Sequence, residues 1–340
     1  MVLTDAALRP VTRGLMYNSS GFDDEATRIA AYAPDPHITR SSGSDLGRMM
    51  RLQSEDPENR AVHMLHQGDF ITAKLIARGG LSDHNNALKS GFDPVTGQWP
   101  SWAADAGVRI DLLPDVKPTG AALSRISPQR AAHFGLSPDA IVHAGTTDSI
   151  AAFLACAPLS SGAAVTSLGT TLAVKLLSPD RTDAPDLGLY SHRLGDQWLV
   201  GRASNTGGGV LLHFFSLDQI ERLSRQIDPD VPSTLDDYPL IKPGEQFPIN
   251  GPSFAPRLTP RPKSDAAFLH GLMESIARIE AECYQTIERL EAERPNIIYT
   301  AGGGGSNAVW TAIRNCGLSV DIQTPKATEA AVGAARLTHI

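Results

Sequence analysis

Hydrophobic positions along the chain change repeatedly from a period of two to a period near 3.6, which is the pattern of mixed α and β structure. Apolar runs at 163–168, 172–177 and 197–203 predict three strands, and a short turn joins the first two. A polar, proline-rich stretch at 228–262 separates them from an apolar stripe with steps of three or four residues, which predicts one long helix. The stripe consists of Leu269, Leu272, Ile276, Ile279, Cys283, Ile287 and Leu290.

The last part of the chain alternates strand and helix. The pattern predicts a buried strand at 297–300, a loop at 302–305, a helix at 307–314, a strand at 319–322 and a final helix at 329–337. Three strands, a helix and then two strand–helix units predict a compact α/β domain of the ribonuclease H kind.

The first 100 or so residues are less regular. Short strands are predicted at Val2–Thr4 and Gly14–Tyr17, and Ala140–Val142 predicts a buried strand further along. Helices are predicted at 23–32, 44–53 and 67–78. The polar, turn-rich segment 82–93 predicts either a surface loop or the wall of a ligand cleft.

Length and composition limit the class of protein. A chain of 340 residues exceeds what one core usually serves, so we expect two lobes. Its 41% hydrophobic and 20% charged residues are typical of a soluble globular protein. The formal charge of -7 argues against nucleic acid or an anionic membrane as the main partner. No apolar run reaches transmembrane length and the N-terminus lacks the order of a signal peptide, so we expect a cytoplasmic protein.

Three cysteines, Cys156, Cys283 and Cys316, are odd in number and widely spaced. Their apolar or helical surroundings predict buried, reduced thiols. Because no paired metal-ligand spacing occurs, we predict no metal-binding residues.

One acidic residue, Asp148, lies in a small-residue turn between the strand predicted at Ala140–Val142 and an apolar helix that follows. A position near a helix start favours an anion, because the helix dipole is positive there. Two interpretations stay open at this point. Asp148 is a catalytic carboxylate, or Asp148 or Thr147 is only the N-cap of the helix.

Two glycine-containing turns are candidates for ligand binding. Gly169, Thr170 and Thr171 join two strands, and such a turn can hold a phosphate with its backbone N–H groups and hydroxyls. The four glycines at 302–305 lie between a strand and a helix, where a ligand can approach the backbone closely. Either turn can also be tight without any ligand. The spacing from Gly302 to Asn307 lacks the third glycine of a dinucleotide fingerprint, and no Walker lysine motif is present.

The chain resembles the FGGY carbohydrate kinases. The likeness rests on Ala144–Ser149, Ser167–Thr171, Gly244–Pro248, Gly302–Asn307 with Trp310, and Glu329–Ala335, which occur in the family's order. Within the family it is most similar to the xylulokinase-like D-ribulose kinases of cyanobacteria and plants. That finer likeness rests on Tyr17–Asn18, Ser82–Asp83, Asn86–Lys89, Gly145–Leu154 and Tyr190–His192.

The resemblance implies a two-lobed, actin-like or ribonuclease H-like α/β ATPase fold. It divides the chain into a partial sugar-binding domain at 1–155, a nucleotide-binding domain at 156–327, and a helix at 328–340 that returns to the first domain. It also implies that the protein phosphorylates D-ribulose with ATP and Mg²⁺, so its partners are a small sugar and a nucleotide.

Roles for single residues also follow from the resemblance. Asp148 matches the family's catalytic base, and Ser149 lies beside the sugar. The phosphates of ATP are bound by Gly169, Thr170 and Thr171. Adenosine is bound by Gly303, Gly304 and Asn307, with Trp310 packed nearby.

The sequence departs from the family at its start. The family begins with an aspartate-containing glycine/threonine hairpin that binds phosphates and magnesium, followed by a glycine-rich loop that contacts the sugar, and this sequence contains neither. We therefore expect an incomplete first lobe and a complete second lobe. One hypothesis is a fragment of a D-ribulose kinase, and the other is a nucleotide-binding protein without kinase activity.

Overall fold

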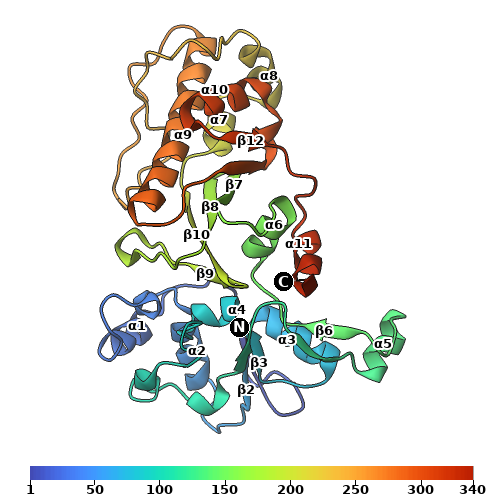
Figure 1. Ribbon diagram of the computed structural model, residues 1–340. Coiled ribbons are helices and arrows are strands. Elements are labelled where there is room, and N and C mark those ends of the chain that lie inside the picture. The colour runs from blue at the N-terminus through green and yellow to red at the C-terminus, as the bar shows by residue number, and fades with distance from the viewer. Residues whose placement is uncertain (340) are drawn as a thin grey trace. The chain divides into compact units, whose positions relative to one another are not determined.

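The computed structural model describes residues 1–339, and these form two compact units (Figure 1). The first unit contains 1–151, 192–195 and the end of the chain from 334. The second unit contains 152–191 and 196–333. The chain passes from the first unit to the second within helix α6 (Asp148–Cys156). The domain boundaries expected at 155/156 and 327/328, and the roles given to those domains, stay predictions.

A mixed sheet forms the centre of the second unit. Its strands are β7 (Ala163–Leu168), β8 (Leu172–Ser178), β10 (Gln197–Ser204), β11 (Ile297–Ala301) and β12 (Asp321–Gln323). Their order is β12-β11-β7-β8-β10, in which β8 is antiparallel to both of its neighbours. The strand β11 runs parallel to β7 and to β12. Strands were predicted at all five places, and the structure confirms them.

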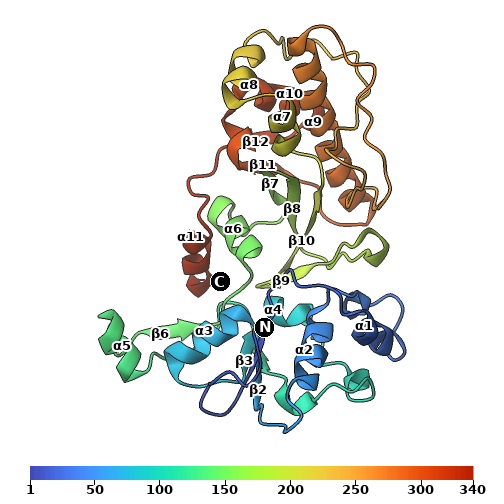
Figure 2. The same cartoon turned by 180° about the vertical axis from the view of Figure 1, so that it is seen from behind.

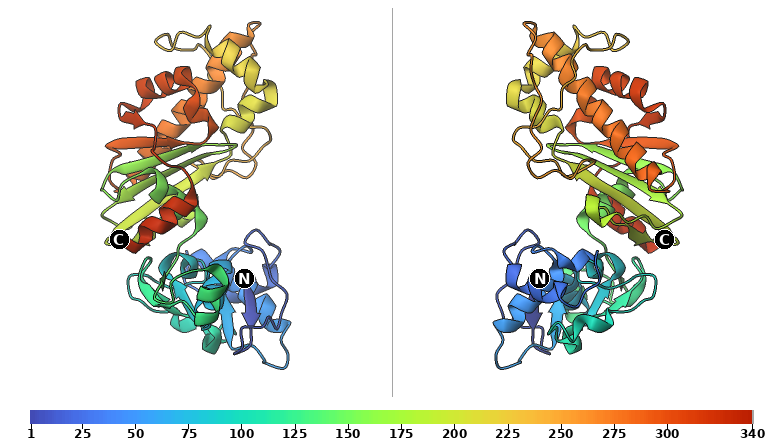
Figure 3. Two further views of the ribbon diagram at one scale, coloured as in Figure 1. Left: turned by 90° about the vertical axis from the view of Figure 1, so that its right-hand side faces the viewer. Right: turned by 90° about the vertical axis from the view of Figure 1, so that its left-hand side faces the viewer.

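Helices α9 and α10 cover one face of this sheet, which Figure 3 shows edge-on. The helices of the unit are α7 (Gly208–Phe214), α8 (Leu217–Ser224), α9 (Asp265–Arg289), α10 (Ala308–Leu318) and α11 (Ala330–Arg336). The end of α11, from residue 334, belongs to the first unit. The predicted apolar stripe of α9 is buried from Leu269 to Ile287 in the core of the unit. Each such side chain contributes about 1.5–3 kcal/mol by leaving water, so the stripe fixes the side of α9 that packs inward. Ser264 caps the helix by accepting from the N–H of Ala267.

The first unit combines short strand pairs with helices (Figure 2). The pairs are β1 (Val2–Thr4) with β2 (His63–Leu65), β3 (Leu81–Asp83) with β4 (Asp115–Lys117), and β5 (Ala122–Arg125) with β6 (Ile141–His143). The helices are α1 (Asp23–Ala30), α2 (Asp45–Ser54), α3 (Gln67–Ile76), α4 (His84–Leu88) and α5 (Pro128–Phe134). The short strand β9 (His192–Leu194) is also part of this unit. Its main core contains Leu3, Ile29, Leu46, Met49, Leu52 and Met64.

Single turns of 3-10 helix complete the two units. They are Ile38–Arg40, Ser101–Ala103, Ile110–Leu112, Pro185–Leu187, Gly303–Ser306 and Leu337–His339. The turn at Gly303–Ser306 is the one that concerns the candidate site, because it contains most of the second glycine-rich loop.

One strand prediction for the first unit was wrong, and a second was right about the strand but wrong about its burial. Gly14–Tyr17 forms no strand, because its ladder stops after Leu15 exchanges backbone hydrogen bonds with Met1. Tyr17 is instead 80% exposed. The strand expected at Ala140–Val142 exists as β6, but Ile141 is 46% exposed. Among residues 1–339, β6 pairs with β5 alone, in a two-stranded sheet.

The segment 82–93 was expected at the surface or in a cleft wall, but most of it is buried. Its polar side chains are tolerated there because they bind one another: Asp83 accepts hydrogen bonds from Asn85 and Asn86 at the start of α4. The prediction of three buried cysteines was wrong for Cys316, which is exposed on α10, whereas Cys156 and Cys283 are buried.

Candidate functional site

The turn between β7 and β8 offers hydrogen-bond donors to a ligand. Thr170 and Thr171 are exposed, and Gly169 is partly so. Among residues 1–339, no acceptor takes a hydrogen bond from the backbone N–H groups of Gly169, Thr170 or Thr171. Successive unpaired N–H groups in a tight turn make a site for an anion, since each carries a partial positive charge. The turn therefore has free donors from which a phosphate could accept hydrogen bonds, and its role in phosphate binding stays a prediction.

A second glycine segment, Gly207–Gly209, holds the other side of this turn. The N–H of Gly208 donates to the carbonyl of Gly169 at 2.8 Å, and the N–H of Gly209 donates to the carbonyl of Thr170 at 3.0 Å. A Cβ atom on Gly208 would lie 2.8 Å from the carbonyl oxygen of Gly169, and one on Gly209 would lie 2.8 Å from that of Thr170. Only glycine therefore allows the two segments to approach so closely. The turn is thereby anchored through its carbonyls, and its N–H groups stay available.

Sequence reasoning missed Gly207–Gly209. The signal was present, because three consecutive glycines come shortly after the strand β10 and form the start of the helix α7, with Gly207 as its N-cap. This is the same strand–glycine–helix pattern that drew attention to 302–305.

The loop at 302–305 packs against the same turn. A Cβ atom on Gly304 would lie 2.8 Å from Cβ of Leu168 and 2.7 Å from Cζ3 of Trp310. Around Gly303, in contrast, a Cβ atom would meet nothing within 4 Å. Gly304 is therefore required by packing, whereas Gly303 faces open space where a ligand can approach the backbone.

Asn307 and Trp310 connect this loop to the core of the second unit. The side-chain oxygen of Asn307 caps α10 by accepting from the N–H of Trp310 at 3.0 Å, and its amide donates to Oγ of Ser224 at 2.9 Å. Trp310 is only 2% exposed and its indole donates to the carbonyl of Met273. Trp310 thus lies beneath the loop, where it supports Gly304.

Three glycine segments, the turn at 168–171 and the segments 207–209 and 302–305, therefore pack together inside the second unit. They bring together the predicted residues Gly169, Thr170, Thr171, Gly303, Gly304 and Asn307. The result is a polar backbone surface with hydroxyls beside it, which suits a phosphorylated ligand.

Asp148 lies in the first unit, as the first residue of α6, and its side chain is exposed. The carbonyl of Thr147 accepts from the N–H groups of Ile150 and Ala151, so Thr147 occupies the N-cap position. Thr147, and not Asp148, is therefore at the N-cap position of α6, and the catalytic role of Asp148 stays a prediction. One carboxylate oxygen of Asp148 accepts from the N–H of Ser149 at 2.6 Å. The other candidate residue of this turn, Ser149, is exposed as well.

A buried amide supports the turn before Asp148. The side chain of Asn85 donates to Oγ1 of Thr119 at 3.1 Å and to Oγ1 of Thr146 at 3.0 Å. Asn85 is 2% exposed, so this contact fixes Thr146 from inside the first unit. Sequence reasoning did not single out Asn85, because nothing in the pattern shows that 85 and 146 are neighbours.

Asp83 begins the helix that carries Asn85. Burial raises the pKa of Asp83 to about 6, and the negative charge of Asp69 adds to that rise. Hydrogen bonds from Asn86 and Asn85 act in the opposite direction, but they do not cancel the effect of burial.

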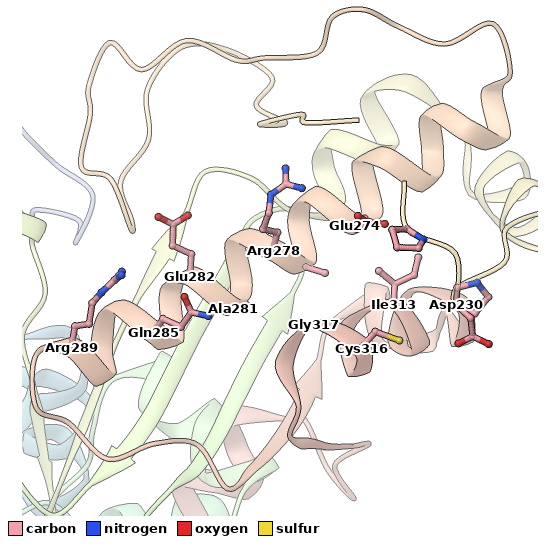
Figure 4. Close-up of a pocket in the computed structure, with 13 residues that line it drawn as sticks. Asp230, Glu274, Arg278, Ala281, Glu282, Gln285, Arg289, Ile313, Cys316 and Gly317 are labelled. Atoms are coloured by element: carbon pink, nitrogen blue, oxygen red, sulfur yellow. The ribbon is translucent and has the colours of Figure 1, made fainter. Parts of the chain in front are cut away.

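A groove of about 570 Å³ lies elsewhere on the second unit, between α9, α10 and the segment 229–232 (Figure 4). Charges of both signs line it, among them Arg278, Arg289 and Glu282, and Cys316 lies at its α10 side. None of the three glycine segments contributes to its lining, so it is separate from the candidate site.

Within residues 1–339, no group of three or more His, Cys, Asp or Glu side chains is placed to hold a metal ion. In the same part of the chain, no helix has both the length and the apolar character needed to span a membrane.

Comparison with solved structures shows what the chain is similar to, whereas no family model matches its sequence. A xyloylose kinase from Brucella ovis shares 20% identity at a TM-score of 0.85, over 100% of this chain and 73% of that protein. A xylulose kinase from Rhodospirillum rubrum shares 19% identity at a TM-score of 0.85, over 100% of this chain and 72% of that protein. A glycerol kinase from Plasmodium falciparum, solved with ADP, shares 14% identity at a TM-score of 0.84, over 99% of this chain and 72% of that protein.

This chain has the fold of these sugar kinases. The predicted mixed α/β, actin-like ATPase fold is thereby confirmed. At these identities the likeness concerns the fold, so the reaction and the substrate have to be argued from the site.

Proposed function

We propose that this protein transfers the γ-phosphoryl group of ATP to a ketopentose, with D-ribulose as the substrate and D-ribulose 5-phosphate as the product. The observation that carries the proposal is the turn at 169–171, whose N–H groups are unpaired while its carbonyls are held by Gly208 and Gly209. The fold shared with sugar kinases supports the same conclusion. The choice of D-ribulose rests on the sequence resemblance.

In this proposal the second unit binds the nucleotide. Gly169, Thr170 and Thr171 donate hydrogen bonds to its phosphates, and Gly303 lets the adenosine approach the backbone. Phosphoryl transfer depends mainly on positioning and on stabilising negative charge, and a rigid turn with fixed donors supplies both. Gly304, Asn307 and Trp310 keep the loop in place.

Asp148 acts as the general base. Its exposed carboxylate takes the proton from the sugar hydroxyl while that oxygen forms a bond to the γ-phosphorus and the bond to the ADP oxygen breaks. Ser149, next to it at the start of α6, contacts the sugar. Asn85 holds the preceding turn through Thr146, so the base is presented from a fixed backbone.

Magnesium accompanies the nucleotide in this proposal. Among residues 1–339 no protein-only cage for a metal exists, and Mg²⁺ in such sites takes many of its ligands from phosphates and water. When bound, the ion neutralises phosphate charge. We infer a cytoplasmic location, where ATP and free pentoses are both available.

The test is an ADP-release assay with ATP, Mg²⁺ and D-ribulose, with D-xylulose, glycerol and gluconate in parallel, and with Asp148→Asn as the matched control. Release that requires D-ribulose and Asp148 supports the proposal. Release with another of these substrates would keep the reaction class and replace the sugar.

A second candidate is a nucleotide-binding protein without kinase activity, because all three glycine segments belong to the second unit. Titration calorimetry with ADP separates the two. Heat of binding without turnover favours the second candidate, and no binding excludes both.

A further inference from the structure

A fully buried ion pair lies under the candidate site in the second unit. Arg314 of α10 and Glu280 of α9 are both 0% exposed. They form two parallel hydrogen bonds, from Nε to Oε2 at 2.6 Å and from Nη2 to Oε1 at 2.7 Å. Such a bidentate contact fixes both the distance and the angle between α9 and α10, whereas an apolar contact has no such directional requirement.

Two threonines attach this pair to the sheet. Thr166 donates its hydroxyl to Oε1 of Glu280, and Nη1 of Arg314 donates to Oγ1 of Thr300 at 2.8 Å. The hydroxyl of Tyr284 also bonds to Thr166, at 2.9 Å. Thr166 of β7 and Thr300 of β11 are paired in the parallel ladder, so their side chains point to the same face of the sheet.

Each of these threonines lies near the end of the strand that leads into a glycine segment of the candidate site. Thr166 precedes Gly169 by three residues on β7, and Thr300 precedes Gly302 by two on β11. Arg314 itself lies on α10, the helix that the loop at 302–305 leads into. The ion pair therefore contacts β7, which precedes the turn at 169–171, and β11, which precedes the loop at 302–305. Through Arg314 it also includes α10, which follows that loop.

Stability alone does not account for this pair. Removing two charges from water costs several kcal/mol, and apolar residues of similar volume often give equal or greater stability. A buried pair is best explained where it fixes a particular arrangement. Here the arrangement is the close contact of Gly302 and Gly304 with Leu168.

We propose that Glu280 and Arg314 are positioning residues, which hold the turn at 169–171 and the loop at 302–305 in the relative position that a nucleoside diphosphate requires. This inference deepens the proposed function and rests on it for the identity of the ligand. Neither residue touches the ligand, since both are buried.

The test uses the full chain and two variants. Glu280→Met with Arg314→Met removes both charges together. Thr166→Val with Thr300→Val keeps both charges and removes the two hydroxyl links to the ion pair, together with the bond between Thr166 and Tyr284. The control is Thr286→Val, which deletes a hydroxyl of α9 bonded to Arg289 instead of the ion pair. Should the methionine variant fail to fold, the valine variant still tests the proposal.

Two readouts are measured at a temperature at which all variants are folded. By calorimetry, we expect the Kd for ADP to rise about tenfold or more in the methionine variant and about threefold in the valine variant, which corresponds to about 1.4 and 0.7 kcal/mol. By amide hydrogen exchange without ligand, we expect faster exchange in both 167–171 and 302–307, and no change in the control.

The outcomes are distinct. Unchanged exchange in the two segments, or an unchanged Kd in both variants, overturns the positioning role. If the unaltered protein binds no ADP, the proposed function fails, and the exchange measurement still decides whether the pair fixes the two segments.

Discussion

Gly302 packs so closely on Leu168 that a Cβ atom at position 302 would lie 2.7 Å from the Leu168 carbonyl oxygen. Gly302 also has a φ of 87°, which side chains of L-residues rarely adopt. The second glycine-rich loop is therefore built onto the first turn, and the two cannot move apart without losing this contact.

The first prediction separates packing glycines from a ligand-facing one. We expect Gly302→Ala to lower the free energy of unfolding by about 1–3 kcal/mol, because it adds both a clash and backbone strain. Gly303→Ala meets no protein atom within 4 Å, so we expect unchanged stability and weaker ADP binding. Urea unfolding and calorimetry on the two variants measure this. Equal stability losses would show that the contact with Leu168 is not what requires glycine.

The second prediction concerns the base. Asp148→Asn keeps the size of the side chain but removes its ability to take a proton, so we expect kcat to fall about 10²–10⁴-fold. The Kd for ADP should stay within error, because the nucleotide residues all belong to the second unit. Steady-state kinetics with D-ribulose and ADP calorimetry give the two numbers. Turnover that survives the substitution would remove Asp148 from the base role.

The third prediction tests the amide that supports the turn. Asn85→Ala breaks the hydrogen bonds to Thr119 and Thr146, and we expect a loss of about 1–3 kcal/mol in stability because the buried hydroxyl of Thr119 and the half-buried hydroxyl of Thr146 each lose a partner. We also expect a lower kcat for sugar phosphorylation with an unchanged Kd for ADP. Thr119→Val is the matched control, since it removes one of these bonds and keeps the link to Thr146. If both variants lose kcat equally, the effect is general destabilisation and not the position of Asp148.

The second unit was predicted well from the sequence because its signals are local. The stripe from Leu269 to Ile287 and the runs that became β7, β8 and β11 each bury a face that the periodicity alone identifies. The candidate turn residues at 169–171 were likewise visible as glycine and threonine between two strands.

The parts that were missed depend on contacts between distant segments. Asn85 is 61 residues from Thr146, and Gly208 is 39 from Gly169, so no local pattern connects either pair. The burial of 82–88 was missed for a related reason. Polar residues are expected at the surface, and only the hydrogen bonds around Asp83 reveal why these are tolerated inside.

The last prediction follows from the raised pKa of Asp83, which is about 6 in the folded protein against 3.8 for the ordinary group. The folded state holds this proton more tightly than the unfolded state does. The stabilisation is therefore complete below about pH 3.8, is lost as pH rises toward 6, and amounts to roughly 3 kcal/mol at most.

Asp83→Asn keeps an acceptor for the N–H groups of Asn85 and Asn86 but cannot ionise. Relative to the unaltered protein, we expect the variant to gain stability between pH 4 and 6 and to show a constant difference above about pH 7. Thermal unfolding from pH 4 to 8 measures this difference. Asp139→Asn is the control for net charge, because the ion pair of Asp139 with Arg125 is exposed to water and screened. A difference between the Asp83 variant and the unaltered protein that does not change with pH would mean that Asp83 stays ionised in the folded state across this range.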